Sequence, residues 1–181
     1  MKRSPAGLVG SFLIDIERIG DERGFFARIW DEAWSDELGV DIRNVQTNLS
    51  TNRRRGTIRG LHWQEEPFGE SKLLRCTRGA VFDVAVDLRP QSSTYRRWQG
   101  HVLDADARRM VFVPAGCAHG YQALEDDTEV SYQVSHAYVP GSERGIRWDD
   151  PTIGIEWPIS VDVIVSEKDA SWPDLEPPVR V

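Results

Sequence analysis

The chain has 181 residues, of which 40% are hydrophobic and 28% charged, as in an ordinary globular protein. Its net charge of −7 argues against non-specific binding to nucleic acid or to an anionic membrane. No apolar run approaches the ~18 residues of a membrane-spanning helix, so we expect a cytoplasmic protein that contacts neither nucleic acid nor membrane. The two cysteines, Cys76 and Cys117, lack CxxC spacing, which favours two buried thiols over a disulfide framework or a zinc site.

The N-terminal part predicts short strands followed by one short helix. Residues 7–19 alternate between apolar and polar, which predicts one or two strands. A turn at 21–24 and a further strand at 25–30 follow. We expect a helix of about two turns within 31–39, with Asp31 as its N-cap and Gly39 as its C-terminal stop.

From residue 45 onward the pattern is that of an all-β domain. Turn residues recur every ~8–12 residues, and Arg78-Gly79 is typical of a hairpin turn, so the pattern predicts a sandwich or barrel. The part from about residue 140 is predicted to wrap around it as loops and short helices. No linker divides the chain, so we expect a single domain over 1–181. The predicted strands are 45–50, 57–64, 72–77, 80–88, 98–103, 110–114, 120–124 and 130–138.

Two histidines lie in glycine-containing segments that resemble the two motifs of cupins. His119 ends the segment Pro-Ala-Gly-Cys-Ala-His, which we expect to form a tight turn, and His62 lies within Arg-Gly-Leu-His-Trp-Gln. In metal-binding cupins the first motif supplies a second histidine and a glutamate, but Gln64 and Lys72 stand in their place here. Because an ammonium group repels a cation, we expect no metal and no cofactor.

Without a metal, these side chains suit proton transfer beside a carbonyl group. A neutral imidazole such as that of His62 is a competent base near pH 7. Lys72 can stabilise negative charge that develops on an oxygen, as in an enolate. Tyr132, on an alternating strand, is a candidate proton donor, since a phenol has a pKa of about 10. Taken singly, each residue is more often explained by a structural role: a core histidine for His62, a surface charge for Lys72 and a half-buried strand residue for Tyr132.

The chain resembles the dTDP-4-dehydrorhamnose 3,5-epimerase family, which consists of metal-free cupins of sugar-nucleotide metabolism. The resemblance covers roughly residues 10–175 in the expected order. Its most specific parts are Arg-Gly-Leu-His-x-Gln at 59–64, Asp-Val-Ala-Val-Asp-Leu-Arg at 83–89 and Trp-x-Asp-Pro at 148–151. The resemblance implies a mainly β, cupin-type double-stranded β-helix jelly roll with a few short helices.

The resemblance also implies an activity and a catalytic set. The reaction would be epimerisation at C3 and C5 of a nucleotide-linked 4-keto-6-deoxyhexose. We expect the nucleotide to be dTDP. His62 would remove the protons, and Asp169 would orient its ring. Lys72 would stabilise the enolate, and Tyr132 would return a proton on the opposite face.

Further residues are implied to bind the nucleotide sugar. Arg59 would contact the diphosphate through its guanidinium fork, and Asp83 would support the pocket from behind. In the family, the residues matching Arg23 and Phe26 reach the neighbouring subunit, which implies a homodimer with exchanged N-terminal strands. Tyr138 would stack on the nucleotide base, and the remaining residues implied to line the pocket are Gln46, Asn48 and His119.

Several alternatives stay open at this point. The family usually has an acidic residue where this chain has Arg28, which leaves the nucleotide base undetermined. A single-site epimerase, acting at C3 only or C5 only, would use the same residues. A metal-dependent cupin enzyme and a non-catalytic sugar-nucleotide binder are the two alternatives from other classes.

Overall fold

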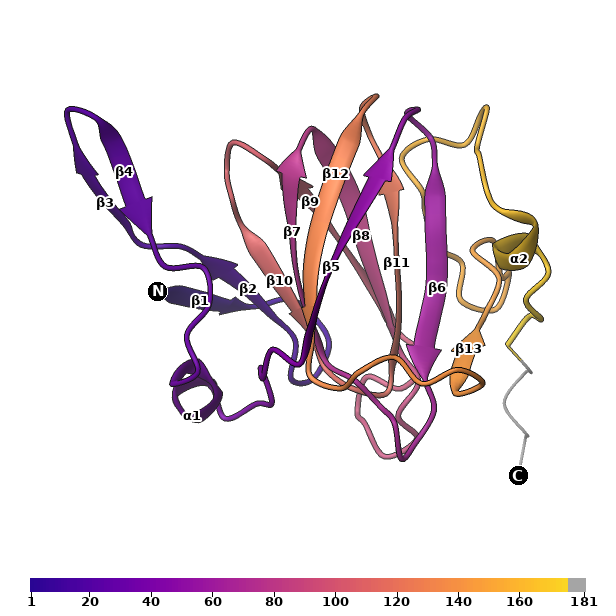
Figure 1. The fold of residues 1–181 in the computed structure, drawn as a ribbon. Coiled ribbons are helices and arrows are strands. Elements are labelled where there is room, and N and C mark those ends of the chain that lie inside the picture. Colours follow the sequence, from indigo (N-terminus) through magenta and orange to yellow (C-terminus); the bar gives the residue numbers. More distant parts are fainter. Residues whose placement is uncertain (176–181) are drawn as a thin grey trace.

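The computed structural model describes residues 1–175 and shows two antiparallel sheets that face each other (Figure 1). This confirms the mainly β, cupin-type jelly roll expected from the sequence. The six-stranded sheet has the order β1 (Lys2–Pro5), β2 (Phe12–Asp15), β10 (Met110–Val113), β7 (Lys72–Arg78), β12 (Thr128–Val134) and β5 (Gln46–Asn52). The five-stranded sheet has the order β13 (Glu143–Gly145), β6 (Ile58–Gln64), β11 (Cys117–Ala123), β8 (Ala80–Asp87) and β9 (Trp98–Asp104).

Alternation along the strands directs one set of side chains into the space between the sheets. Leu74, Val111 and Val130 from the six-stranded sheet meet Val81 and Ala85 from the other. Burying side chains of this size stabilises the fold by about 1.5–3 kcal/mol each. This apolar core fills one part of the space between the sheets, and polar side chains line the remaining part.

Both cysteines lie in this core as free thiols, as the sequence predicts. Burial raises the pKa of Cys76 to about 11 and that of Cys117 to about 12. Both therefore stay protonated at neutral pH, which makes them poor nucleophiles.

The outer faces of the sheets are covered by the two ends of the chain. Helix α1 (Trp34–Leu38) packs Trp34 and Leu38 against Leu73 and Phe112 of the six-stranded sheet. The C-terminal segment packs Ile146 and Ile153 against the five-stranded sheet, and it carries helix α2 (Glu167–Ala170) along its side (Figure 1). Helix α2 therefore lies where its side chains can reach the interior of the barrel. Within residues 1–175 neither helix is long and apolar enough to cross a bilayer.

A hairpin of β3 (Arg18–Asp21) and β4 (Gly24–Ala27) projects away from the barrel (Figure 1). Its strands pair only with each other, and Ile19 and Phe26 are 69% and 66% exposed. We call this hairpin, residues 18–27, the arm. An arm with such exposed apolar side chains is typical of a segment that contacts another molecule.

Several expected boundaries were wrong. Strand β11 begins at Cys117, so His119 lies inside a strand, and the turn ends at Gly116, whose φ is +79°. Strand β12 ends at Val134, which leaves Tyr138 in the following loop. Strands β1 and β13 were missed, because a fully exposed strand such as β1 shows no alternation and β13 has only three residues.

The helix ends are set partly by the expected residues. Gly39 terminates α1 with a left-handed φ of +65°, as predicted, but the N-cap is Ala33, and Asp31 instead accepts a hydrogen bond from the Ala33 N–H. Ser166 caps α2 by accepting from the Asp169 N–H. This cap fixes where Asp169, on the first turn of α2, lies relative to the barrel.

Candidate active site

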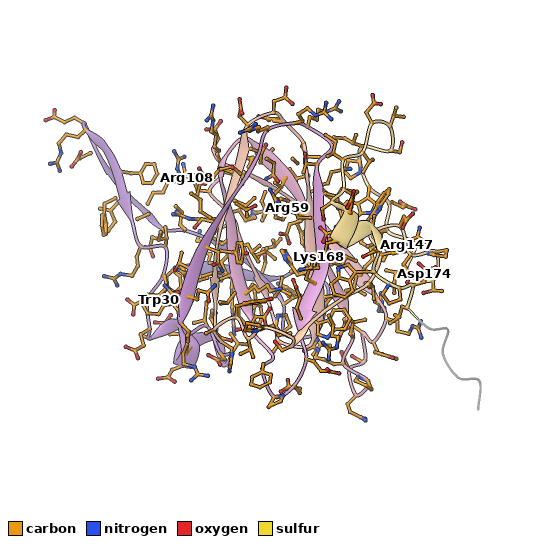
Figure 2. The ribbon with its side chains drawn as sticks, turned by 45° about the vertical axis from the view of Figure 1, so that its right-hand side comes forward. Trp30, Arg59, Arg108, Arg147, Lys168 and Asp174 are labelled. Atoms are coloured by element: carbon orange, nitrogen blue, oxygen red, sulfur yellow. The ribbon has the colours of Figure 1, made fainter. Side chains whose placement is uncertain are left out.

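A cavity of about 320 Å³ lies between the sheets and receives side chains from both of them. Arg59 and His62 come from β6, Tyr132 from β12 on the opposite sheet, and Lys168 and Asp169 from α2. Figure 2 shows Arg59 between the sheets and Lys168 at the short helix α2. The other lining residues are Ser50, Lys72, Leu74, His119, Gly120, Tyr121 and Ser166.

A second cavity of about 240 Å³ shares His62, Lys72 and Tyr132 with the first. The two cavities therefore form one continuous site around these three side chains. The residues that line only the second are Gln46, Asn48, Trp63, Gln64, Glu70, Val134, His136, Tyr138 and Glu143.

Two glycines allow β6 and β11 to approach closely behind the site. A Cβ atom on Gly60, whose φ is +116°, would lie 2.6 Å from the Gly120 Cα atom. A Cβ atom on Gly120 would lie 2.5 Å from the Arg59 carbonyl oxygen. Because no side chain fits at either position, the strands pair with His62 directly opposite His119.

His62 is oriented by Asp169. The His62 Nε2 atom lies 2.7 Å from Asp169 Oδ1, and the Gly60 N–H donates to Oδ2 at 3.2 Å. Burial raises the pKa of Asp169, but the hydrogen bond and charge of His62 and the Gly60 N–H together lower it below its usual value. Because an ionised carboxylate only accepts, Nε2 carries the hydrogen and Nδ1 is left as the basic nitrogen.

The free nitrogen of His62 has an acidic neighbour that the sequence analysis did not single out. Glu143 Oε1 on β13 lies 3.9 Å from Nδ1, and the other Glu143 oxygen forms a short ion pair with Lys168. The Trp172 ring packs edge-on against the imidazole with 6.2 Å between centroids. The imidazole is thus fixed on three sides and is 25% exposed.

Lys72 lies beside His62 with its side chain 10% exposed. Its Nζ donates to the His62 carbonyl oxygen at 3.1 Å and lies 3.2 Å from Glu70 Oε1. A buried ammonium is stable only with such partners. The Lys72 ammonium group is therefore held in place beside the cavity and presents its positive charge to it.

Tyr132 is half-buried on the wall opposite His62. Burial is the main cause that raises the pKa of Tyr132 above the usual value for a phenol, and the nearby Tyr121 raises it further. The charge of Arg59 offsets part of this shift. The Tyr132 hydroxyl accordingly keeps its proton at neutral pH and can act as a donor. It faces the cavity from the six-stranded sheet, whereas the imidazole faces it from the five-stranded one.

Arg59 presents a cation to the cavity, and its hydrogen-bond partners Asn52 and Thr51 are neutral. Its Nε donates to Asn52 Oδ1 at 2.8 Å, and a terminal nitrogen donates to the Thr51 carbonyl oxygen at 3.0 Å. Since neither partner carries a charge, the guanidinium retains its full attraction for an anion.

His119 and Asp83 form a second histidine–carboxylate pair, with 2.8 Å between Nε2 and Oδ2. Both side chains are almost fully buried, at 8% and 2% exposure. Asp83 thus supports His119 from behind, at the position where the sequence analysis expects a supporting residue.

The remaining expected binding residues divide into two groups. Gln46, Asn48 and Tyr138 line the second cavity, where Gln46 Nε2 donates to Asn48 Oδ1 and Gln46 Oε1 accepts from the Tyr138 N–H. Arg23 and Phe26 lie on the arm, outside both cavities of their own chain, and Arg23 pairs with Asp21.

Arg28 lies just beyond the arm. It forms an ion pair of 2.8 Å with Asp31 and lines neither cavity. Among residues 1–175, no group of three or more His, Cys, Asp or Glu side chains is arranged to hold a metal ion.

A jelly roll that directs ionisable side chains into its interior is characteristic of the cupin class, and comparison with known proteins narrows this class to one family. The sequence model of the dTDP-4-dehydrorhamnose 3,5-epimerase family matches residues 5–177. The chain belongs to this family, whose members are isomerases acting on carbohydrates.

Individual relatives agree with this assignment. A dTDP-4-dehydrorhamnose 3,5-epimerase from Sinorhizobium fredii is 47% identical over 163 residues, 90% of this chain and 84% of the relative. A dTDP-4-dehydrorhamnose 3-epimerase from Streptomyces niveus is 38% identical, over 91% of this chain and 79% of the relative. A crystal structure of the 3,5-epimerase from Bacillus anthracis with TDP and PPi bound has a TM-score of 0.91 at 38% identity, covering 96% of this chain and 99% of that one.

Proposed function

We propose that the chain epimerises C3 and C5 of a dTDP-linked 4-keto-6-deoxyhexose. The observation that carries the proposal is the position of His62 and Tyr132 on opposite sheets, across one cavity, with Lys72 beside the histidine. Inverting a carbon centre needs a base on one face and an acid on the other. The reaction alpha to a ketone also needs a positive group near the oxygen that becomes negative.

In the first half of the reaction, His62 Nδ1 takes the proton from C3 or C5. The electrons of the broken C–H bond move into a double bond to C4, and the C4 oxygen becomes an enolate oxygen. The Lys72 ammonium stabilises that charge. Asp169 keeps the proton of the imidazole on Nε2, so that Nδ1 is the nitrogen that accepts.

In the second half, the Tyr132 hydroxyl gives its proton to the other face of the same carbon. The ketone re-forms, and the configuration at that carbon is inverted. His62 then holds one proton too many and Tyr132 one too few. Exchange with solvent restores both, so solvent hydrogen enters the product.

The nucleotide part of the substrate would extend from the same cavity. Arg59 suits a diphosphate oxygen because its guanidinium donates to two neutral acceptors, Asn52 Oδ1 and the Thr51 carbonyl oxygen. His119 would line the sugar pocket, Gln46 and Asn48 would offer hydrogen bonds, and Tyr138 would stack on the base. The exposed ring of Tyr138, at 54%, is available for such stacking.

We further propose a homodimer in which each arm completes the site of the other chain. Arg23 and Phe26 are exposed on the arm and contribute to neither cavity of their own chain. In a partner's site, Phe26 would cover the base and Arg23 would pair with the phosphates.

A second candidate function is epimerisation at C3 alone. The Streptomyces niveus relative, named a 3-epimerase, is 38% identical to this chain, so the family contains enzymes that differ in this respect. The base, the acid and the cation would be the same in both cases. The outcome would depend on which carbon faces His62 and for how long the intermediate is held.

Proton NMR of the purified protein with dTDP-4-keto-6-deoxyglucose in deuterium oxide tests the proposal. Loss of both the C3 and C5 proton signals supports the double epimerase, and loss of one supports the single-site variant. Absence of exchange at both carbons would exclude the activity. His62→Asn is the control, because removal of the base should abolish exchange at both positions, by about 10²–10⁴-fold.

A further inference from the structure

Glu70 is a buried carboxylate to which neither the sequence analysis nor the mechanism assigns a role. It lies in the loop between β6 and β7, and it lines the second cavity with its side chain 7% exposed. One oxygen, Oε1, lies 3.2 Å from Lys72 Nζ. The other, Oε2, is buried without a hydrogen-bond partner in the part of the chain that the structure describes. A carboxylate oxygen buried in this way is costly unless something donates to it.

The surroundings of Lys72 indicate where that donor would lie. An ammonium group has three N–H donors. One is directed to the His62 carbonyl oxygen, and the ammonium group also forms an ion pair with Glu70 Oε1, so Lys72 can still offer a donor to the cavity. A ketone oxygen that accepts a hydrogen bond from Lys72 would therefore lie close to the Glu70 carboxylate.

We propose that Glu70 Oε2 accepts a hydrogen bond from the substrate hydroxyl group at C3, and that Glu70 thereby favours reaction at C3 over reaction at C5. The inference rests on the proposed function and deepens it. In a 4-keto-6-deoxyhexose, C3 carries a hydroxyl group next to the ketone. The other reacting carbon, C5, carries the ring oxygen and a methyl group, neither of which can donate.

The chemistry of the pair explains why a carboxylate suits this position. Glu70 Oε2 presents a hydrogen-bond acceptor, and the Lys72 ammonium group beside it presents a donor. A vicinal hydroxyl and ketone present the complementary donor and acceptor. Because hydrogen bonds to an ionised group are stronger than neutral ones, this arrangement orients the sugar ring with C3 fixed relative to His62.

The test compares the wild-type protein with Glu70→Gln by the rates of deuterium entry at C3 and C5. The amide keeps the size of the side chain and one carbonyl oxygen for Lys72, but it loses an acceptor. We expect the C3 rate to fall about ten-fold relative to the C5 rate, as for the loss of one hydrogen bond to a charged group. Glu66→Gln, an exposed residue of the same loop, is the matched control and should leave both rates unchanged.

A 3-deoxy analogue of the substrate gives a second measurement that does not depend on exchange at C3. If Glu70 binds the C3 hydroxyl, wild type and Glu70→Gln should bind this analogue equally, whereas wild type should bind the natural substrate more tightly. Equal loss of the two exchange rates in Glu70→Gln would show that Glu70 only holds Lys72, and no loss would show that Glu70 does not act on the substrate. Either result would overturn the proposal. Absence of exchange in the wild-type protein would instead refute the proposed function itself.

Discussion

At the scale of single residues, the chemistry depends on which nitrogen of His62 is free. Asp169 occupies Nε2 at 2.7 Å, and the other nitrogen faces the cavities, where the nearest carboxylate oxygen is 3.9 Å away. The same imidazole in the other tautomer would present an N–H to the substrate and could not accept a proton. In the proposed mechanism, the Asp169 carboxylate therefore decides whether His62 can act as the base.

Replacing Asp169 by Asn should lower kcat about ten- to a hundred-fold, since it removes a hydrogen bond to an ionised group and allows the other tautomer. The substitution should also change the pH dependence of stability. The pKa of Asp169 is lowered in the folded state, so its contribution is present above the unfolded pKa of about 4 and is lost as pH falls through the folded value.

Urea unfolding of both proteins from pH 2 to pH 7 checks the second part of this prediction. The difference in unfolding free energy between wild type and Asp169→Asn should be largest near neutral pH and should shrink in acid. A difference that is constant over this range would show that the carboxylate charge has no part in holding the pair together.

Replacing Tyr132 by Phe should separate proton removal from proton return. Deuterium exchange at the substrate carbons needs only His62 and Lys72, so it should persist in this variant, while net epimerisation should fall about 10²–10⁴-fold. NMR in deuterium oxide measures exchange, and the ratio of product epimers measures inversion. Normal turnover of Tyr132→Phe would make the assignment of the acid wrong.

The sequence predicts the residues of this site better than it predicts their partners. His62, Lys72, Tyr132 and Asp169 lie in segments that resemble one family, and all four line a single cavity. The contacts of Glu70 and Glu143 could not be predicted in the same way. Each depends on a loop or a three-residue strand whose position is set by tertiary packing and leaves no periodic signal. Lys168 is the neighbour of Asp169 in the sequence, so its place beside the cavity follows from the position expected of Asp169.

At the scale of secondary structure elements, the site depends on how closely β6 and β11 approach. The alternating pattern predicts both strands. It predicts the start of β11 three residues late, because the whole of the glycine-containing segment 114–119 has the residues of a turn. What the pattern does not contain is the contact between Gly60 and Gly120, which lie far apart in the sequence. Only the paired sheet shows that neither position has room for a side chain.

Gly60→Ala should therefore destabilise the protein by more than a positive φ alone accounts for. Gly141 is the matched control, since its φ of +91° is also left-handed but a Cβ atom there would meet no atom within 4 Å. We expect about 1–2 kcal/mol for Gly141→Ala from backbone strain, and more than about 3 kcal/mol for Gly60→Ala, where the strands must also separate. Equal losses in urea unfolding would show that the close approach is not required.

At the scale of the whole molecule, the arm is the one part of residues 1–175 whose strands join neither sheet of the barrel. It exposes Ile19 and Phe26, while the guanidinium groups of Arg18 and Arg108 both lie over the ring of the partly exposed Phe25. The arm is thus anchored at its base and apolar on its free side. This arrangement supports the proposed contact of the arm with a second copy of the chain.

Mixing two inactive variants tests whether the arm completes the site of a partner. One variant carries His62→Asn and an intact arm, and the other carries Arg23→Ala with Phe26→Ala and an intact His62. In a mixed dimer, the intact site of the second chain would receive the intact arm of the first. We therefore expect the mixture, after unfolding and refolding together, to recover a substantial part of wild-type epimerisation, although each variant alone is nearly inactive.

The controls of this experiment separate exchange of arms from simple dimerisation. A protein that carries all three substitutions, refolded together with wild type, gives mixed dimers in which neither chain has both an intact site and an intact incoming arm. That mixture should be less active than the same amount of wild type alone. The activity of the mixture of the His62→Asn variant with the arm variant is compared with its dimer content, measured by size-exclusion chromatography. If this mixture recovers no activity although it forms dimers, each arm serves its own chain. A monomer at all concentrations would exclude the dimer itself.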